Sequence, residues 1–168
     1  MKSVCAIGFL LLLVSLLAGP AVASSESPKN GGIFKMATHQ DIPTLDCMMT
    51  SADVVYDVGG HIFETLVQYI TADGKIAPEL ADSWTVSKDS LKFTFKIRQG
   101  VKFHNGAELT SEDVLASVDR WFKHGARGGI ARPYLDRLST PDKYTFEIHL
   151  NQPYAPLFSL LGFGMVGR

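Results

Sequence analysis

The five histidines are the residues best suited to proton transfer or metal binding near neutral pH. None of them forms the i, i+4 pair that a zinc protease places on one face of a helix. His39 keeps a candidate role, because it lies two residues before Asp41 and could hydrogen-bond or coordinate a ligand. We expect structural or surface roles for the others, which are His61, His104, His124 and His149.

Two arginines are candidates for gripping an anion. Arg127 and Arg132 flank a glycine-rich segment, and a planar guanidinium holds a carboxylate or a phosphate through paired hydrogen bonds. The alternative is that both are solvated surface charges. The residue types alone leave these two interpretations open.

Three consecutive sulfur-containing residues, Cys47, Met48 and Met49, could bind a soft metal such as Cu(I). We favour hydrophobic packing of this loop, because methionine more often fills gaps in a core than it binds metal. We also expect Cys47 to be buried as a small apolar side chain. The sequence therefore predicts no metal site and no cofactor.

Signatures of catalysis are missing from the sequence. It contains no phosphate-binding G-x-x-x-x-G-K-[ST] loop, no G-x-S-x-G nucleophile turn and no dinucleotide-binding glycine spacing. We therefore predict a binding protein that is not an enzyme. The alternative is an exported metal-dependent hydrolase that would use His39 and Asp41.

The N-terminus has the pattern of a signal peptide. Lys2 precedes an apolar run at residues 4–18, and Gly19-Pro20 leads to small residues that suit cleavage after Ala23. An uncleaved membrane anchor is the alternative, but the run is shorter than the ~20 residues that span a bilayer. Residues 24–30 are expected to be a flexible lead-in to one domain at 31–168. Losing Lys2 changes the formal net charge from −1 to −2, which gives no reason to expect a nucleic-acid partner.

Hydrophobic periodicity predicts an antiparallel sheet with helices. Residues 91–98 alternate strictly between apolar and polar, as do residues 144–150, and a strand around Trp84 would join them. Thr110 is expected to cap a helix that Gly125 ends. The other expected elements are a buried strand at 33–38, a loop at 39–51, a helix at 53–69, a turn at 73–74, a hairpin connection at 87–90, a flexible basic loop at 125–129 and a helix or strand at 153–163.

Two long stretches resemble one known family. They are LVQYITADGKIAPELADSWTV at residues 66–86 and FKIRQGVKFHNGAELTSEDV at residues 95–114. They are similar to family 5 of the extracellular solute-binding proteins, which serve importers of peptides, nickel and oligosaccharides. The loop at 42–46 and the strand at 143–150 extend the resemblance over most of the chain. Within the second stretch, His104-Asn105-Gly106 is expected to form a tight turn that identifies the fold and does not touch a ligand.

The resemblance implies an α/β fold of the periplasmic-binding-protein type (type II), with a mixed sheet and helices. This chain would be the N-terminal part, incomplete without a C-terminal lobe. Ligands of the family lie in a cleft between two lobes. Carried over by position, the cleft residues near one wall are Thr50, Ser51 and Val55, and those near another are Arg127 and Arg132.

The implied function is capture of a small solute in the periplasm and its delivery to the permease subunits of an ABC importer. The solute would be a peptide, an oligosaccharide or a metal chelate. A binding protein that reports ligand occupancy to a membrane sensor is a further alternative, which the sequence does not separate from import.

Overall fold

The computed structural model describes residues 31–70, 72, 74–162 and 165–166. The expected signal peptide and lead-in lie outside these residues. Residues 31–37 and residues 38–168 belong to separate units, so each is described by itself. Within the described residues, no helix has both the length and the apolar character needed to cross a bilayer.

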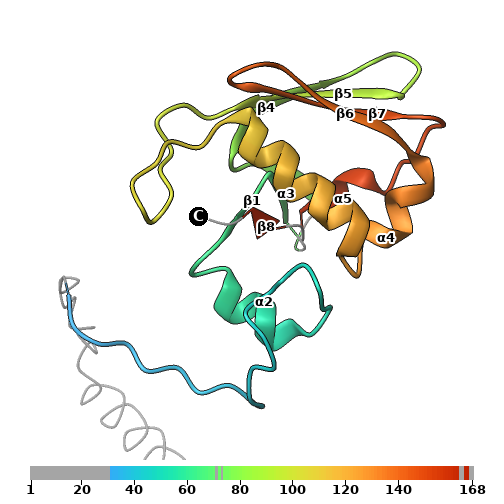
Figure 1. Cartoon of the computed structure of the whole chain (residues 1–168). Coiled ribbons are helices and arrows are strands. Elements are labelled where there is room, and N and C mark those ends of the chain that lie inside the picture. The colour runs from blue at the N-terminus through green and yellow to red at the C-terminus, as the bar shows by residue number, and fades with distance from the viewer. Residues whose placement is uncertain (1–30, 71, 73, 163–164, 167–168) are drawn as a thin grey trace, which may run out of the picture. The chain divides into compact units, whose positions relative to one another are not determined.

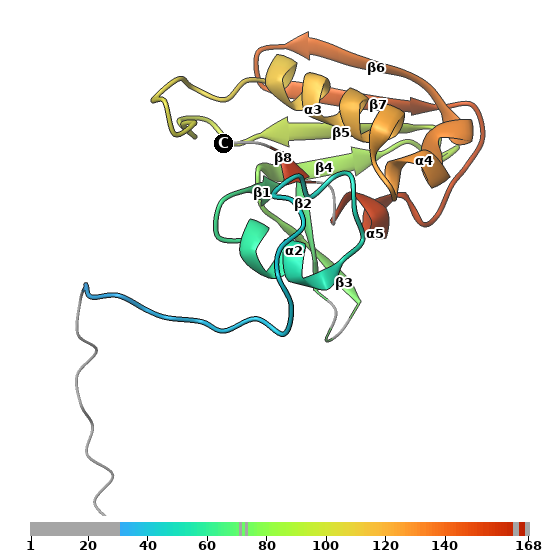
Figure 2. The ribbon, with the colours of Figure 1, turned by 60° about the horizontal axis from the view of Figure 1, so that its bottom comes forward.

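A four-stranded antiparallel sheet organises the second unit. Its strands are β4 (Ala81–Val86), β5 (Lys92–Ile97), β6 (Leu135–Asp142) and β7 (Thr145–Leu150). Figure 2 shows them side by side in the order β4-β5-β7-β6. The predicted alternation in β5 is confirmed, because Phe93, Phe95 and Ile97 are buried, whereas Lys92 and Lys96 are exposed and Thr94 is half-buried. The sequence analysis missed β6.

Helices cover one face of this sheet (Figure 1). The longest is α3 (Ser111–His124), and Phe158 of α5 (Leu157–Leu161) contacts the ring of Phe95 on β5. The predicted cap of α3 is confirmed as a capping box in which the carboxylate of Asp113 accepts the backbone N–H of Thr110 at 2.8 Å. The buried face of α3 consists of Ser111, Val114, Val118, Trp121 and Phe122.

The segment at 53–69 was predicted to be one helix, and this prediction is wrong. Only α2 (Asp53–Gly59) is helical, and the chain then forms β1 (Glu64–Thr65) and β2 (Val67–Ile70). Gly59-Gly60 ends the helix because glycine has a low helix propensity, and the β-branched residues that follow favour extended backbone. Leu66 and Val67 are fully buried in this extended stretch.

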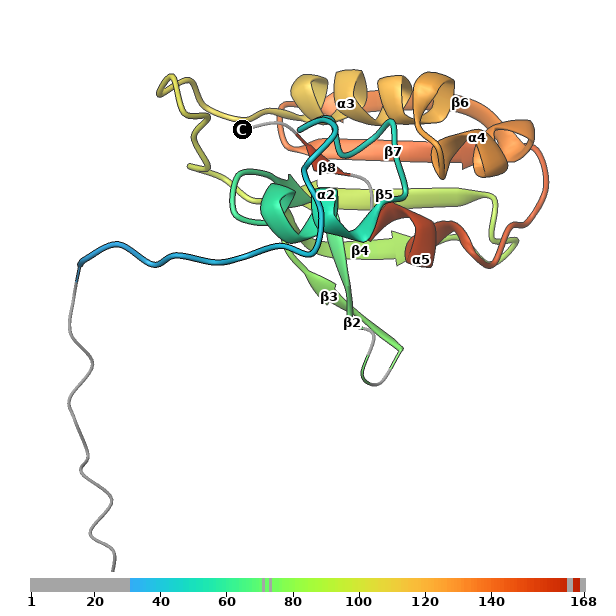
Figure 3. The ribbon, with the colours of Figure 1, turned by 90° about the horizontal axis from the view of Figure 1, so that it is seen from below.

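Two short sheets complete the unit. Strand β2 pairs antiparallel with β3 (Lys75–Pro78), and β1 pairs with β8 (Met165–Val166). The predicted turn between β2 and β3 is confirmed at Gly74, whose φ of 69° suits glycine. Figure 3 shows this hairpin projecting away from the four-stranded sheet.

The strand predicted at residues 33–38 is absent, which corrects the sequence analysis. Ile33 and Phe34 are each 89% exposed, and no described strand pairs with this segment. A strand is held by ladder hydrogen bonds to a neighbour, so its apolar pattern alone does not form one.

The segment after α3 is also more ordered than predicted. In place of a flexible loop at 125–129, the chain forms the short helix α4 (Gly128–Ala131) and a 3₁₀ turn at Arg132–Tyr134. Gly125 and Gly128 are both buried. Close packing of these two glycines on Trp121 accounts for this order, as described below.

The signature turn is tied to the sheet by Glu108. The turn has the expected positive φ at Gly106, 86°, and the carboxylate of Glu108 accepts hydrogen bonds from the amine of Lys143 and the hydroxyl of Tyr144, each at 2.8 Å. The hydrogen bond from Lys143 is the main reason that the pKa of Glu108 falls to about 2.

We expect this contact to favour the folded state fully above the ordinary glutamate pKa of 4.5 and to lose its effect as the pH falls through about 2. A carboxyl carbon titration by NMR should show the Glu108 midpoint near the lower value. The Lys143→Met variant should return the midpoint toward 4.5. A midpoint near 4.5 in the unaltered protein would contradict the contact.

Candidate functional site

The loop before α2 is organised by Asp46. The backbone N–H of Asp46 bonds to the hydroxyl of Thr44 at 3.0 Å, and its carbonyl accepts the N–H of Met49 at 3.2 Å. Its carboxylate accepts the N–H of Met48 at 3.2 Å. These bonds form a tight turn in a segment that contains no helix or strand, as the sequence predicted for residues 39–51.

Arg120 of α3 holds this turn from the other side. Its Nη1 donates to Oδ1 of Asp46 at 3.2 Å, and its Nη2 donates to Oδ2. The hydrogen bonds from Arg120 hold the pKa of Asp46 below its ordinary value. Figure 3 shows the loop lying against α3, and a second tie follows α3, where the N–H of Ala126 donates to the carbonyl of Met48 at 2.9 Å.

Arg127 lies over the aromatic ring of Tyr56. Its guanidinium carbon is 4.8 Å from the ring centroid, within the distance of a cation–π interaction. The hydroxyl of Tyr56 donates to the carbonyl of Thr50 at 2.8 Å. Burial raises the pKa of the Tyr56 hydroxyl, so it remains a protonated donor at neutral pH. Thr50 and Arg127, predicted on separate walls, therefore meet through Tyr56.

The backbone of Arg127 is held by close packing on Trp121. A Cβ added at Gly128 would lie 2.0 Å from the carbonyl oxygen of Trp121, and one at Gly125 would lie 2.5 Å from the same atom. The N–H of Gly125 also donates to that oxygen at 2.8 Å. The two glycines thus allow the chain to wrap around Trp121, which fixes the segment that carries Arg127.

A cavity of about 490 Å³ lies between the loop and α3. This volume is in the range of small-molecule sites. Its wall is mostly apolar, with the Asp46–Arg120 pair and Ser117 as its polar groups. The remaining lining residues are Leu45, Cys47, Met48, Phe63 and Ala116.

The other predicted cleft residues lie in different environments. Val55 is fully buried beside Cys47 and Val54, so its side chain does not face a ligand and its positional assignment is corrected. Ser51 is exposed next to Thr50. His39 is exposed in a bend, and Arg132 is exposed at the start of the 3₁₀ turn.

The sulfur-containing residues divide into two environments. Cys47 is 3% exposed and its thiol donates to the carbonyl of Val55 at 3.7 Å, which confirms the expected burial. Burial also raises the pKa of this thiol. Met48 packs against the main core, whereas Met49 is 50% exposed, so the packing prediction is wrong for Met49. In the described part of the chain, no group of three or more His, Cys, Asp or Glu residues could hold a metal ion.

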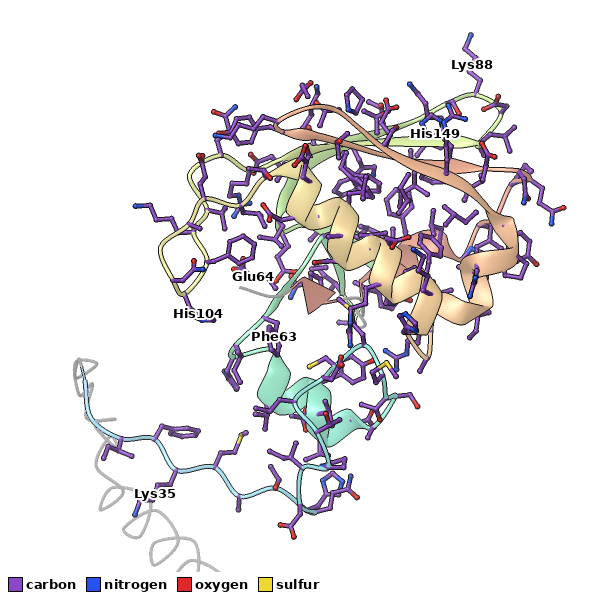
Figure 4. All side chains as sticks on the ribbon, viewed as in Figure 1. Lys35, Phe63, Glu64, Lys88, His104 and His149 are labelled. Atoms are coloured by element: carbon purple, nitrogen blue, oxygen red, sulfur yellow. The ribbon has the colours of Figure 1, made fainter. Side chains whose placement is uncertain are left out.

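A second polar cluster lies on the outer face of the sheet. Nε2 of His149 is 3.1 Å from the hydroxyl of Ser139 and 3.1 Å from Oε2 of Glu147. A hydrolytic triad needs the two ring nitrogens to face different partners, one toward the nucleophile and one toward the carboxylate. One nitrogen faces both here, so the cluster lacks the geometry of a triad. Figure 4 shows His149 on the sheet and His104 at the tip of the loop that precedes α3.

Sequence reasoning missed Tyr56 and the pairing of Asp46 with Arg120. Tyr56 was not assigned a role, although it follows Val55 in α2 and packs against the buried cluster of Cys47, Val54 and Val55. Asp46 and Arg120 are 74 residues apart, so no local pattern joins them. A contact of this kind follows only from the packing of the loop on α3.

Comparison with known proteins places this chain and its fold among solute-binding proteins. The family described as "Bacterial extracellular solute-binding proteins, family 5 Middle" has a sequence model that matches residues 75–164. A probable peptide ABC transporter periplasmic-binding protein of Sinorhizobium fredii is 32% identical over 165 residues, which cover 96% of this chain and 29% of that protein.

Two solved structures extend this likeness. A binding protein of Agrobacterium tumefaciens in complex with agropinic acid is 34% identical, with a TM-score of 0.65 over 75% of this chain and 26% of that one. A Brucella suis protein in complex with Fe(III)-EDTA is 32% identical, with a TM-score of 0.58 over 64% of this chain and 23% of that one.

The protein is therefore of the extracellular solute-binding class. More particularly, the chain belongs to family 5 of the bacterial extracellular solute-binding proteins. It spans about three tenths of the length of the Sinorhizobium relative that it matches. The predicted family and the predicted fold are both confirmed.

Proposed function

We propose that the chain is the N-terminal part of a periplasmic solute-binding component of an ABC importer. The protein captures a small solute and passes it, chemically unchanged, to the permease. Membership of family 5 supports the binding role. An export signal at residues 1–23 and cleavage after Ala23 belong to the same proposal, because a periplasmic protein must cross the inner membrane.

The observation that carries the proposal is the arrangement of Arg127 over Tyr56 beside Thr50. A guanidinium can meet a carboxylate through two parallel hydrogen bonds. Thr50, whose carbonyl accepts the hydroxyl of Tyr56, and exposed Ser51 beside it in the chain would supply hydroxyl groups. Arg132 and His39 serve as outer contacts that a second lobe would bring nearer to the solute.

The solute is a small molecule with a carboxylate group. The similar proteins support this class, since one is named for peptides, one binds agropinic acid and one binds Fe(III)-EDTA. Each of these ligands carries carboxylate groups. Mass spectrometry of molecules that co-purify with the full chain is the direct way to identify the solute.

The anchor role of Arg127 is tested by calorimetric titration of the full chain with trialanine and with trialanine amide. We expect Arg127→Ala to weaken trialanine binding by about 10- to 100-fold, because a charge-assisted hydrogen-bonded pair contributes ~1.5–3 kcal/mol. The amide should bind weakly to both proteins. The measurement requires that trialanine binds the unaltered protein.

Arg137→Ala is the matched control. Arg137 is also a surface arginine, and its Nη1 pairs with the neighbouring Asp136 at 2.9 Å on β6. This variant should bind trialanine as the unaltered protein does. Unchanged affinity after Arg127→Ala and Arg132→Ala together would remove the anchor assignment.

A further inference from the structure

A closed ring of contacts surrounds the anchor. Arg120 of α3 bonds to Asp46, and the turn that Asp46 organises leads to Thr50. The carbonyl of Thr50 accepts the hydroxyl of Tyr56, whose ring lies under Arg127. Arg127 follows α3 directly, so the ring returns to the helix from which it started.

The Asp46–Arg120 pair is a partly exposed part of this ring. The side chains are 34% and 46% exposed, so the pair contributes little to global stability. The two parallel hydrogen bonds nevertheless fix both the distance and the relative orientation of the Asp46 carboxylate and the Arg120 guanidinium. The loop contains no helix or strand. The described ties between it and the α3 segment are this pair, the contact of Arg120 Nη1 with Sδ of Met48 at 3.2 Å, and the bond from Ala126 to Met48.

We propose that Asp46 and Arg120 are a positioning pair that holds residues 46–50 in place, so that Thr50 and Tyr56 present Arg127 to the solute. This inference rests on the anchor role proposed for Arg127. Neither Asp46 nor Arg120 needs to touch the solute. The pair acts through the turn and the tyrosine.

Hydrogen exchange in the ligand-free full chain tests the positioning independently of the solute. The Asp46→Asn variant keeps an oxygen for the N–H of Met48 but removes the charge that Arg120 binds. We expect the amide of Ala126, which bonds to the carbonyl of Met48, to exchange about tenfold faster in Asp46→Asn and in Arg120→Gln. The amide of Phe95 in the central sheet should be unaffected. Arg120→Lys keeps the positive charge but not the planar guanidinium that donates two hydrogen bonds. Its Ala126 amide should exchange at an intermediate rate.

The matched control is the ion pair between Asp82 and Arg98. It joins exposed side chains at 2.8 Å but lies on β4 and the end of β5, away from the loop. Asp82→Asn should leave the exchange of Ala126 unchanged. With trialanine as the probe, Asp46→Asn should weaken binding about three- to tenfold, whereas Asp82→Asn should not.

The outcomes separate the two proposals. Unchanged exchange at Ala126 in both Asp46→Asn and Arg120→Gln overturns the positioning pair. Faster exchange with unchanged trialanine affinity also overturns it, provided that Arg127→Ala weakens binding, because the tie is then structural only. If Arg127→Ala leaves trialanine binding unchanged, the anchor role fails, and the exchange data still decide whether the pair holds the loop.

Discussion

Replacing Phe95 by alanine is expected to lower the free energy of unfolding by about 3–5 kcal/mol, as for other fully buried aromatic residues. Phe95 has no exposed surface and lies in the central strand β5. Its ring is 6.1 Å from that of Phe146 on β7 and 6.0 Å from that of Phe158 on α5. The substitution would therefore leave a cavity where the sheet and the helical layer meet.

Chemical denaturation of the full chain measures this effect, and Thr85→Ala provides the control. Thr85 is exposed on the neighbouring strand β4, so its loss should change the free energy of unfolding by no more than about 0.5 kcal/mol. A loss below about 1 kcal/mol for Phe95→Ala would mean that the predicted inward face of β5 is not the core.

The strands of the sheet could be predicted from the sequence where one face of a strand is exposed to solvent. The regular alternation in β5 and β7 reports burial on one side, and both strands occur at the predicted positions. Strand β6 gives no such signal, because partly buried and exposed residues follow each other irregularly along it. It is an edge strand and contains Pro141, which such positions tolerate.

Periodicity failed where helix and strand patterns overlap. The apolar residues after Gly60 fit one stripe of a helix, yet they form short strands whose partners lie elsewhere in the chain. Pairing with distant segments supplies backbone hydrogen bonds that a local pattern does not reveal. The converse error concerns residues 33–38, where an apolar run has no described partner strand.

In the candidate site, too, the sequence predicted which segments contribute but not which side chains meet. Position in the family placed Thr50 and Arg127 on two walls, and the structure joins them through Tyr56. The same reasoning selected Val55, which is buried, and passed over Tyr56. Neighbouring helical residues point in directions about 100° apart, so a positional assignment that is one residue off exchanges a core residue for a site residue.

The packing of Gly125 and Gly128 on Trp121 connects the core to the site. Trp121 is 2% exposed and belongs to the main core, while Arg127 lies between the two glycines that contact it. A flexible loop would lose conformational entropy each time a solute bound, which weakens binding. A loop that is already held by packing has lost this entropy on folding. The glycines at these two positions are therefore a requirement of the fold and, if Arg127 is the proposed anchor, of the site.

Gly128→Ala is accordingly expected to destabilise the protein by about 1–3 kcal/mol, the range typical of an overfilled packed interior. The new Cβ would lie 2.0 Å from the backbone oxygen of Trp121, which cannot move aside as a flexible side chain could. Gly129→Ala is the matched control, because a Cβ there meets nothing within 4 Å, and alanine in α4 should be neutral or slightly stabilising. Both variants should be measured by chemical denaturation and by titration with trialanine. We expect only Gly128→Ala to lose both stability and affinity. Equal stability and affinity of the two variants would mean that Trp121 does not hold the segment that carries Arg127.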